Sequence, residues 1–253
     1  MSLTDIASYI GAAAWLYPIY TEIKRKITKP TLHVFPVDSI QLGYTSLGPM
    51  IFLQCAINSE KTEALIVRVK IMVVHEDGDS HILTWKTLDE TQFHFRSFSG
   101  EGGTIEKSQL ATAIKISTGV PIEKRIGFVD PRYQEESQQI IDKLFKQTTY
   151  KRNIQPELSV DEVFKEQEFF EWNSYFKKEM YWKVGRYSLD ILVYAFGLKK
   201  PLIKKYEFEL DSQKIDFLTF NTTLLEQSIK ASVSKSPQVT WGWVFPRITE
   251  KET

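Results

Sequence analysis

The feature that most constrains the fold is a strict alternation of apolar residues in the first half of the sequence. Apolar side chains stand at every second position from Leu65 to Val73, and Arg68 and Lys70 lie between them. This period of two is typical of a half-buried strand, because successive side chains of a strand point to opposite faces. Apolar runs at 50–57 and 82–85 flank it across polar turns. Three successive strands with short turns predict an antiparallel meander.

A second alternating run supports the same class of fold. It consists of Gly185, Tyr187, Leu189, Ile191 and Val193. This pattern resembles a late strand of immunoglobulin-like and fibronectin-type domains, in which a corner tyrosine precedes a cysteine by two residues. Leu189 stands where that cysteine would be, so the resemblance implies the sandwich class without its disulfide. The chain also resembles uncharacterised bacterial membrane-associated proteins, and that resemblance implies no activity.

We therefore expect a mainly β (α+β) fold, an immunoglobulin-like antiparallel β-sandwich with an N-terminal apolar helix and a helical insertion. The sandwich is assigned to residues 30–130 and 181–210, and the insertion to 131–180. Within the insertion, Ser159 and Glu162 match a capping box and predict a helix that runs to about Met180.

The predicted helix after Ser159 carries too many aromatic residues for one narrow stripe. Either the domain covers both of its sides, or one side faces a partner. Core packing is the simpler reading, because large aromatic residues are mostly buried. For contact with a partner we single out Phe169, Trp172 and Phe176.

The N-terminal 28 residues form a separate segment ahead of a single domain at 29–253. Residues 6–21 carry no charge, and a basic cluster follows at 24–26. As a helix the uncharged run would be about 24 Å long, short of the ~30 Å hydrocarbon core. A membrane-inserted or interfacial anchor, a helix packed on protein and a cleaved targeting segment are the three readings. The residues expected to carry anchoring are Trp15, Leu16, Tyr17, Lys24, Arg25 and Lys26.

Composition excludes some classes of function and favours a compartment. Lys+Arg and Asp+Glu both number 32, and this neutral balance counts against a nucleic-acid partner, which needs basic excess. Cys55 is the single cysteine and fits a reducing compartment, where we expect it to be a buried apolar side chain. With the basic flank, this places the chain on the cytoplasmic side of a membrane, or makes it a soluble cytoplasmic protein.

Few residues suggest a metal-binding or catalytic site. The strongest metal candidate is the turn with His75, Asp77, Asp79 and His81, since carboxylates and imidazoles can hold a divalent ion. Its spacing does not match a calcium loop, and Asp77 before Gly78 is ordinary turn chemistry, so we predict a solvated turn and no metal or cofactor. None of the four histidines lies in a recognisable nucleophile motif.

The function predicted from the sequence is a non-catalytic, membrane-proximal protein-binding or adaptor module, whose partner is another protein at a membrane surface. The first alternative is a soluble enzyme of hydrolase type, with a site built from scattered carboxylates and histidines. The second is a soluble oligomeric structural subunit, in which the N-terminal helix packs against another copy.

Overall fold

The computed structural model of the chain describes residues 16, 18–21, 28–96, 102–154, 162, 165–234 and 239–251. Leu16 is helical and 66% exposed, and a helical turn covers 18–21. The other five residues expected to carry anchoring lie outside the described residues: Trp15, Tyr17, Lys24, Arg25 and Lys26. In the part of the chain that is described, no helix combines the length and the apolar character that crossing a membrane requires.

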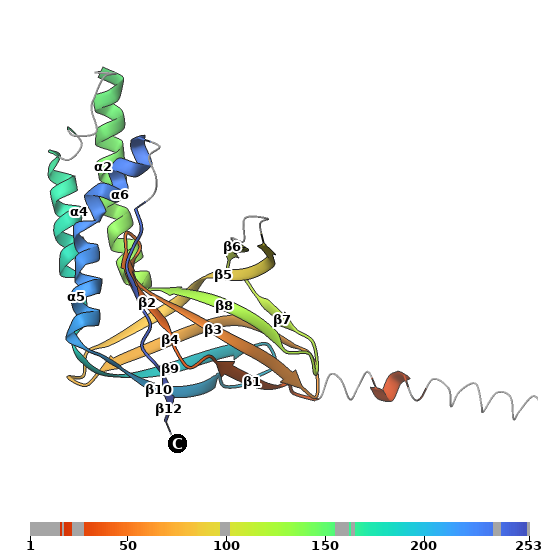
Figure 1. Cartoon of the computed structure of the whole chain (residues 1–253). Helices are drawn as coiled ribbons and strands as arrows, with labels where there is room; N and C mark the ends of the chain where they lie inside the picture. Colours follow the sequence, from red (N-terminus) through yellow and green to blue (C-terminus); the bar gives the residue numbers. More distant parts are fainter. Residues whose placement is uncertain are drawn as a thin grey trace, which may run out of the picture.

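The described strands form one curled sheet of half-barrel shape (Figure 1). Its twelve strands follow the order β11-β2-β3-β8-β5-β4-β9-β10-β12, with β1 on β3, β6 on β5 and β7 on β4. All strand pairs are antiparallel. The bounds are β1 Thr31–Pro36, β2 Gln41–Thr45, β3 Gly48–Glu60, β4 Ala64–His75, β5 Ser80–Arg96, β6 Gly102–Leu110, β7 Ile114–Ile116, β8 Ile122–Val129, β9 Gly185–Ala195, β10 Leu202–Leu210, β11 Trp243–Val244 and β12 Thr249–Glu250.

The mainly antiparallel β character is confirmed, but the strands do not divide into the two packed sheets of an immunoglobulin-like sandwich. Long strands and bulges explain the difference. The thirteen-residue β3 carries β1 and β2 along one edge and β8 along the other. Pairing shifts register within β4 and within β5, and such bulges bend a strand and increase its twist. The sheet therefore curls around its own core.

One bulge in β4 reverses which side chains of that strand face the core. Leu65 and Val67 are 41% and 46% exposed, whereas Ile66 and Val69 are buried. The register shift between Ile66 and Arg68 inserts one residue, so the inward positions change from even to odd numbers. The expected apolar face is therefore correct from Val69 onward and wrong before the bulge.

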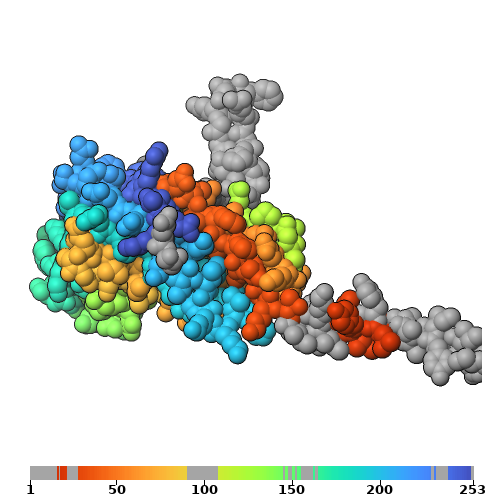
Figure 2. All heavy atoms as spheres, turned by 90° about the horizontal axis from the view of Figure 1, so that it is seen from below, coloured from red at the N-terminus to blue at the C-terminus, as the bar shows by residue number. Residues whose placement is uncertain are grey.

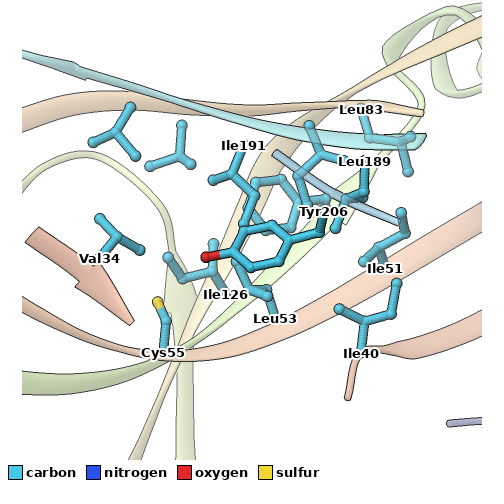
Figure 3. Packing of buried hydrophobic residues seen from close by; sticks show 14 of the residues in the cluster. Val34, Ile40, Ile51, Leu53, Cys55, Leu83, Ile126, Leu189, Ile191 and Tyr206 are labelled. Carbon is cyan, nitrogen blue, oxygen red and sulfur yellow. The ribbon is translucent and has the colours of Figure 1, made fainter. Parts of the chain in front are cut away.

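The main core fills the concave face of the sheet. Figure 3 shows side chains from strands far apart in sequence meeting there, among them Leu53, Leu83, Ile126, Leu189 and Ile191. Each of these is at most 1% exposed. Burial of this kind contributes about 25 cal/mol per Å² of apolar surface, so this cluster is the main source of stability.

The helices gather at one end of the sheet, which we call the helical end (Figure 1). Their bounds are α2 Pro131–Ile154, α4 Gln167–Lys178, α5 Ser212–Phe220, the 3-10 turn η1 Asn221–Thr223 and α6 Leu225–Ser234. Asp130 caps α2, because its carboxylate accepts from the amides of Arg132 and Tyr133. The helical insertion is thus confirmed at its start, but α4 begins at Gln167, and Ser159 lies outside the described residues.

The last described segment, residues 239–251, runs back across the sheet. Its β11 pairs with β2 and its β12 with β10, which stand at opposite edges. Asn221, fully buried, holds the start of this segment: its side-chain amide donates to the Gly242 carbonyl and accepts from the Gly242 amide, both at 2.8 Å. The segment therefore connects the helical end to the two edges of the sheet.

Candidate functional site

The first candidate site is the seam, which we define as the gap between β1 on one side and β10 with residues 246–251 on the other. Ile248 donates from its amide to the Asp38 carbonyl, and Lys251 donates to the Lys205 carbonyl, each at 2.9 Å. The first bond crosses the seam near the helices, and the second holds residues 246–251 to β10. Seen from below in Figure 2, the red-orange N-terminal strands and the blue C-terminal strands lie side by side.

The ladder across the seam stops at a proline. Continuing the pairing of Asp38 with Ile248 in antiparallel register would set Glu250 opposite Pro36, which has no amide hydrogen to donate. Nearer the start of β1, no described residue pairs with the edge of β1 that faces away from β3. Proline inside a sheet is confined to edges and bulges, and Pro36 lies on the edge of β1 that faces away from β3.

A cavity of about 260 Å³ lies where the seam opens. Its walls are residues 34–38, Lys204, Tyr206, Ile248 and Glu250. Lys204 and Glu250 form an ion pair at 2.8 Å. The cavity thus combines apolar side chains from β1, Tyr206 of β10 and Ile248 with one half-exposed ion pair and with Asp38.

The floor of the cavity is electrically neutral. Tyr206 is buried, and its phenol lies toward Cys55 and Val34 (Figure 3). Burial, with the nearby Glu250 and Cys55, raises the pKa of Tyr206 to about 12. Burial also raises the pKa of the Cys55 thiol to about 12. Both groups are therefore protonated at neutral pH, and Cys55 is the buried apolar side chain that the sequence predicted.

The second candidate is the turn between β4 and β5, where the sequence placed its weak metal candidates. The Lys183 ammonium lies between the two carboxylates, 3.0 Å from Asp77 and 3.1 Å from Asp79. His75 uses both ring nitrogens, one 2.9 Å from Asp77 and the other 3.1 Å from the Val184 carbonyl. A cation therefore already stands where a metal would have to bind.

His81 lies at the edge of that group, with one ring nitrogen 3.2 Å from an Asp79 carboxylate oxygen. Its ring stacks on Tyr181 with 3.5 Å between ring centroids. Within the described residues, no group of three or more His, Cys, Asp or Glu side chains is arranged to hold a metal ion. The turn is better described as a latch that fastens the β4–β5 hairpin to the segment ahead of β9.

The latch gives a testable pH dependence. The Asp79 amide, His75 and Lys183 lower the pKa of Asp77, and Lys183 lowers the pKa of Asp79. Groups with lowered pKa values stabilise the fold above their unfolded-state pKa of about 4, and this is lost as pH falls through the lowered values. Lys183→Met should therefore reduce stability modestly at neutral pH, and the difference from wild type should shrink in acid.

Urea unfolding of both proteins across the acidic range measures that difference. The matched control is Arg186→Met, which removes a more exposed ion pair of 3.4 Å with Glu76 and should change stability little. A Lys183→Met difference that stays constant down to the lowest pH at which both proteins still fold, well below the unfolded-state pKa of about 4, would contradict the latch.

The three residues singled out for partner contact lie inside the protein. Phe169, Trp172 and Phe176 form a second buried cluster with Tyr44, Tyr133, Leu144 and Leu225. The reason is geometric: α4 packs its aromatic stripe onto α2 and the β2 end of the sheet, and Tyr44 donates its hydroxyl to the Phe176 carbonyl. These side chains are therefore not available to a partner on this surface.

The third candidate is the end of the sheet opposite the helices, which we call the far end. It consists of the loops at 60–63, 117–121 and 196–201, next to the start of β1. Backbone bonds hold two of these loops to neighbouring strands: the Phe196 amide donates to the Leu65 carbonyl of β4, and the Gly119 amide donates to the Ser59 carbonyl of β3. Phe196 is 77% exposed, and Val120 is exposed too.

Charge at the far end is uneven. Its acidic residues are engaged, Glu60 with His33 at 3.4 Å and Glu63 with Lys115 at 3.0 Å. In contrast, Lys61, Lys199 and Lys200 are exposed and form no ion pair with the described residues. The far end thus presents cationic side chains around exposed apolar ones. This grouping could not be predicted from local sequence patterns, because the loops are distant along the chain.

The fold defines the class at a coarse level: a mainly antiparallel β-protein built on a curled half-barrel sheet. Comparison of the sequence with family models and with curated proteins gives no match. Among solved structures, the chain is similar to a family 123 glycoside hydrolase from Clostridium perfringens that is described for glycolipid glycan hydrolysis. The identity is 11%, the match covers 73% of this chain and 27% of that one, and the TM-score is 0.34. A likeness this low carries no argument about fold or function.

Proposed function

We propose that this protein is a non-catalytic, membrane-proximal binding module, with its far end toward an anionic membrane surface. The observation that carries the proposal is the composition of the far end, whose loops carry the exposed Lys61, Lys199 and Lys200 together with the exposed Phe196 and Val120. Each Lys or Arg near an anionic surface contributes about 1 kcal/mol of attraction. Exposed apolar side chains at loop tips add the burial that interfacial binding uses.

The position of the N-terminal segment supports the same orientation. β1 starts at the far end, so the segment before Thr31 joins the domain there. The basic cluster at 24–26 is five residues from Thr31, a chain distance of at most about 18 Å. Basic residues of the segment and of the far end would then face one surface. The helical end and the seam would remain accessible to a partner on the cytoplasmic side.

Vesicle binding tests the orientation. Reversing two charges with Lys199→Glu and Lys200→Glu should weaken binding to phosphatidylserine vesicles by at least roughly thirtyfold, because about 2 kcal/mol of attraction is removed. The matched control is Lys177→Glu with Lys178→Glu, an equal charge change on α4 at the helical end, which should leave binding unchanged. Equal losses in both double variants would contradict the proposed orientation.

Fractionation tests the anchor separately. We expect the full chain to stay with membranes through high-salt and carbonate washes, and a chain that lacks residues 1–28 to be released by salt. If both chains are fully soluble without detergent, residues 6–21 are not an anchor, and the reading as an oligomeric subunit gains support.

A further inference from the structure

We propose that an apolar patch on the outer face of the sheet enters the interfacial layer of an anionic membrane together with the far end. The inference rests on the proposed function and deepens it, because it names the side chains that contact lipid and tilts the domain so that β4 and β9 lie against the surface. The patch, which we call the outer patch, consists of Leu65, Val67, Leu192, Tyr194, Phe196 and Ile203.

Strand pairing places the outer patch in three neighbouring rows across β7, β4, β9 and β10. Partners in an antiparallel pair carry their side chains on the same face of the sheet. The rows are Phe196 with Leu65 and Lys115, Tyr194 with Arg68, and Ile203 with Leu192 and Lys70. The residues between them along β4 and β9 are buried in the main core, so the rows point away from it.

The bulge in β4 creates much of this apolar surface. It leaves Leu65 and Val67 outside, 41% and 46% exposed, while Ile66 between them is buried. Ile203 is 46% exposed and Phe196 is 77% exposed. Single exposed apolar side chains are ordinary, but four large ones in adjacent rows form a contiguous patch, and such patches mark contact surfaces.

The shape of the outer patch favours lipid over a peptide. Its backbone is already paired on both sides, since β4 lies between β7 and β9, and β9 lies between β4 and β10. A partner strand therefore cannot be added here, and contact has to be made by side chains. The outer face is convex, because the core fills the concave face of the half-barrel (Figure 1). Peptides and helices bind at sheet edges or in grooves, whereas a lipid layer deforms around a convex surface.

The charges around the outer patch are mainly positive. Arg68 and Lys70 stand in its rows and form no ion pair with the described residues. Glu63, the acidic residue next to β4, is paired with Lys115 at 3.0 Å. Asp190 lies one row further toward the helical end. With the lysines of the adjacent far end, this pattern suits anionic headgroups, which attract Lys and Arg close to the surface.

Arg68 and Tyr194 have the geometry of an interfacial pair. The central carbon of the Arg68 guanidinium lies 4.7 Å from the centroid of the Tyr194 ring. Both side chains carry a polar tip on an apolar body, so at a bilayer surface the tips stay with the headgroups. The N-terminal segment joins the domain nearby, since Pro30 lies 3.8 Å from the position that a Cβ on Gly197 would take. The basic cluster at 24–26 therefore enters beside Phe196 and the outer patch.

Binding of the full chain to vesicles of phosphatidylserine and phosphatidylcholine in equal amounts tests the outer patch. Leu65→Thr with Val67→Thr removes apolar surface and keeps side chains that suit a strand. Affinity should fall at least roughly fivefold, because apolar burial in the interface is lost. The matched control is Ile82→Thr with Val184→Thr, at the other end of the sheet. These side chains are 51% and 54% exposed, and the control should bind like wild type.

Salt separates this result from the test of the far end. Apolar burial is not screened, so the ratio of wild-type affinity to that of the Leu65→Thr and Val67→Thr variant should persist as salt is raised. The loss caused by Lys199→Glu with Lys200→Glu should shrink, because salt screens exposed charges.

A fluorescent label reports insertion directly. Cys55 is buried, so a thiol-reactive, environment-sensitive fluorophore labels a new cysteine in Val67→Cys selectively. On vesicles its emission should shift to the blue and be quenched by nitroxide-labelled lipids, whereas the label in Ile82→Cys should show neither change.

Two results would overturn the inference and leave the far-end orientation in place, provided that Lys199→Glu with Lys200→Glu still weakens binding. One is wild-type binding by the Leu65→Thr and Val67→Thr variant, and the other is a label at position 67 that stays in water. A blue shift that needs no vesicles and grows with protein concentration would make the outer patch an interface between copies, which also overturns the inference. If the wild-type chain binds no vesicles, both the inference and the proposed function fail.

Discussion

Replacing Phe176 by alanine should destabilise the protein by about 3–5 kcal/mol, the usual cost of truncating a fully buried phenylalanine. Phe176 has no exposed surface, and its ring packs 4.7 Å from that of Tyr44 and 6.4 Å from that of Trp241. The substitution leaves a cavity where α4 meets the sheet, in a cluster too rigid to collapse fully. Urea unfolding monitored by tryptophan fluorescence measures the loss.

Phe170→Ala is the matched control for this experiment. Phe170 is the same residue type on the same helix, but it is 53% exposed. Its truncation should change stability by less than about 1 kcal/mol. If the Phe176 variant unfolds at the same urea concentration as the Phe170 variant, α4 does not pack on the sheet as described. In that case Phe176 could serve as a partner contact after all.

Gly48→Ala is the second substitution with a large expected effect, about 3 kcal/mol of lost stability. Gly48 has a φ of +84°, in the left-handed region that costs a non-glycine residue roughly 1–2 kcal/mol. A Cβ there would also lie 2.3 Å from the Tyr133 ring. Because Tyr133 is fully buried, the ring cannot move aside without overpacking, which costs about 1–3 kcal/mol.

Gly78→Ala isolates the backbone part of that cost. Gly78 has a similar φ of +92°, but nothing lies within 4 Å of the position its Cβ would take. We expect this variant to lose only about 1–2 kcal/mol. Thermal or urea unfolding of the two variants side by side gives the contribution of the ring contact by difference. Equal losses would mean that Tyr133 does not pack against the β2–β3 turn.

Local patterns in the sequence predicted the local structure well. Alternation located β4 and β9, and the expected helical insertion from residue 131 located the start of α2. These features depend on residues close together along the chain. The bulge in β4 could not be predicted in this way, because inserting one residue leaves the composition of the strand unchanged while it reverses the side that faces the core.

Contacts between segments that are far apart along the chain could not be predicted from the sequence. Residues 247–253 are polar apart from Ile248, so their pattern predicts no strand. The part of them that the structure describes nevertheless supplies a strand to the sheet and a wall to the seam cavity. Lys183 stands some hundred residues from the turn whose carboxylates it joins. Burial of Phe169, Trp172 and Phe176 follows from where α4 packs. The sequence alone left both core packing and contact with a partner open for these residues.

The way in which residues 239–251 close the sheet has an energetic consequence. Their two strands are two residues each. They are held by Asn221, by a few backbone bonds and by the packing of Trp243 on Phe52 and of Val244 in the main core. Most of the core, in contrast, is shared among long central strands. Local unfolding of this segment therefore costs much less free energy than global unfolding. Such opening would remove the wall that Ile248 and Glu250 give to the seam cavity, so the shape of the cavity can change while the melting temperature of the protein stays the same.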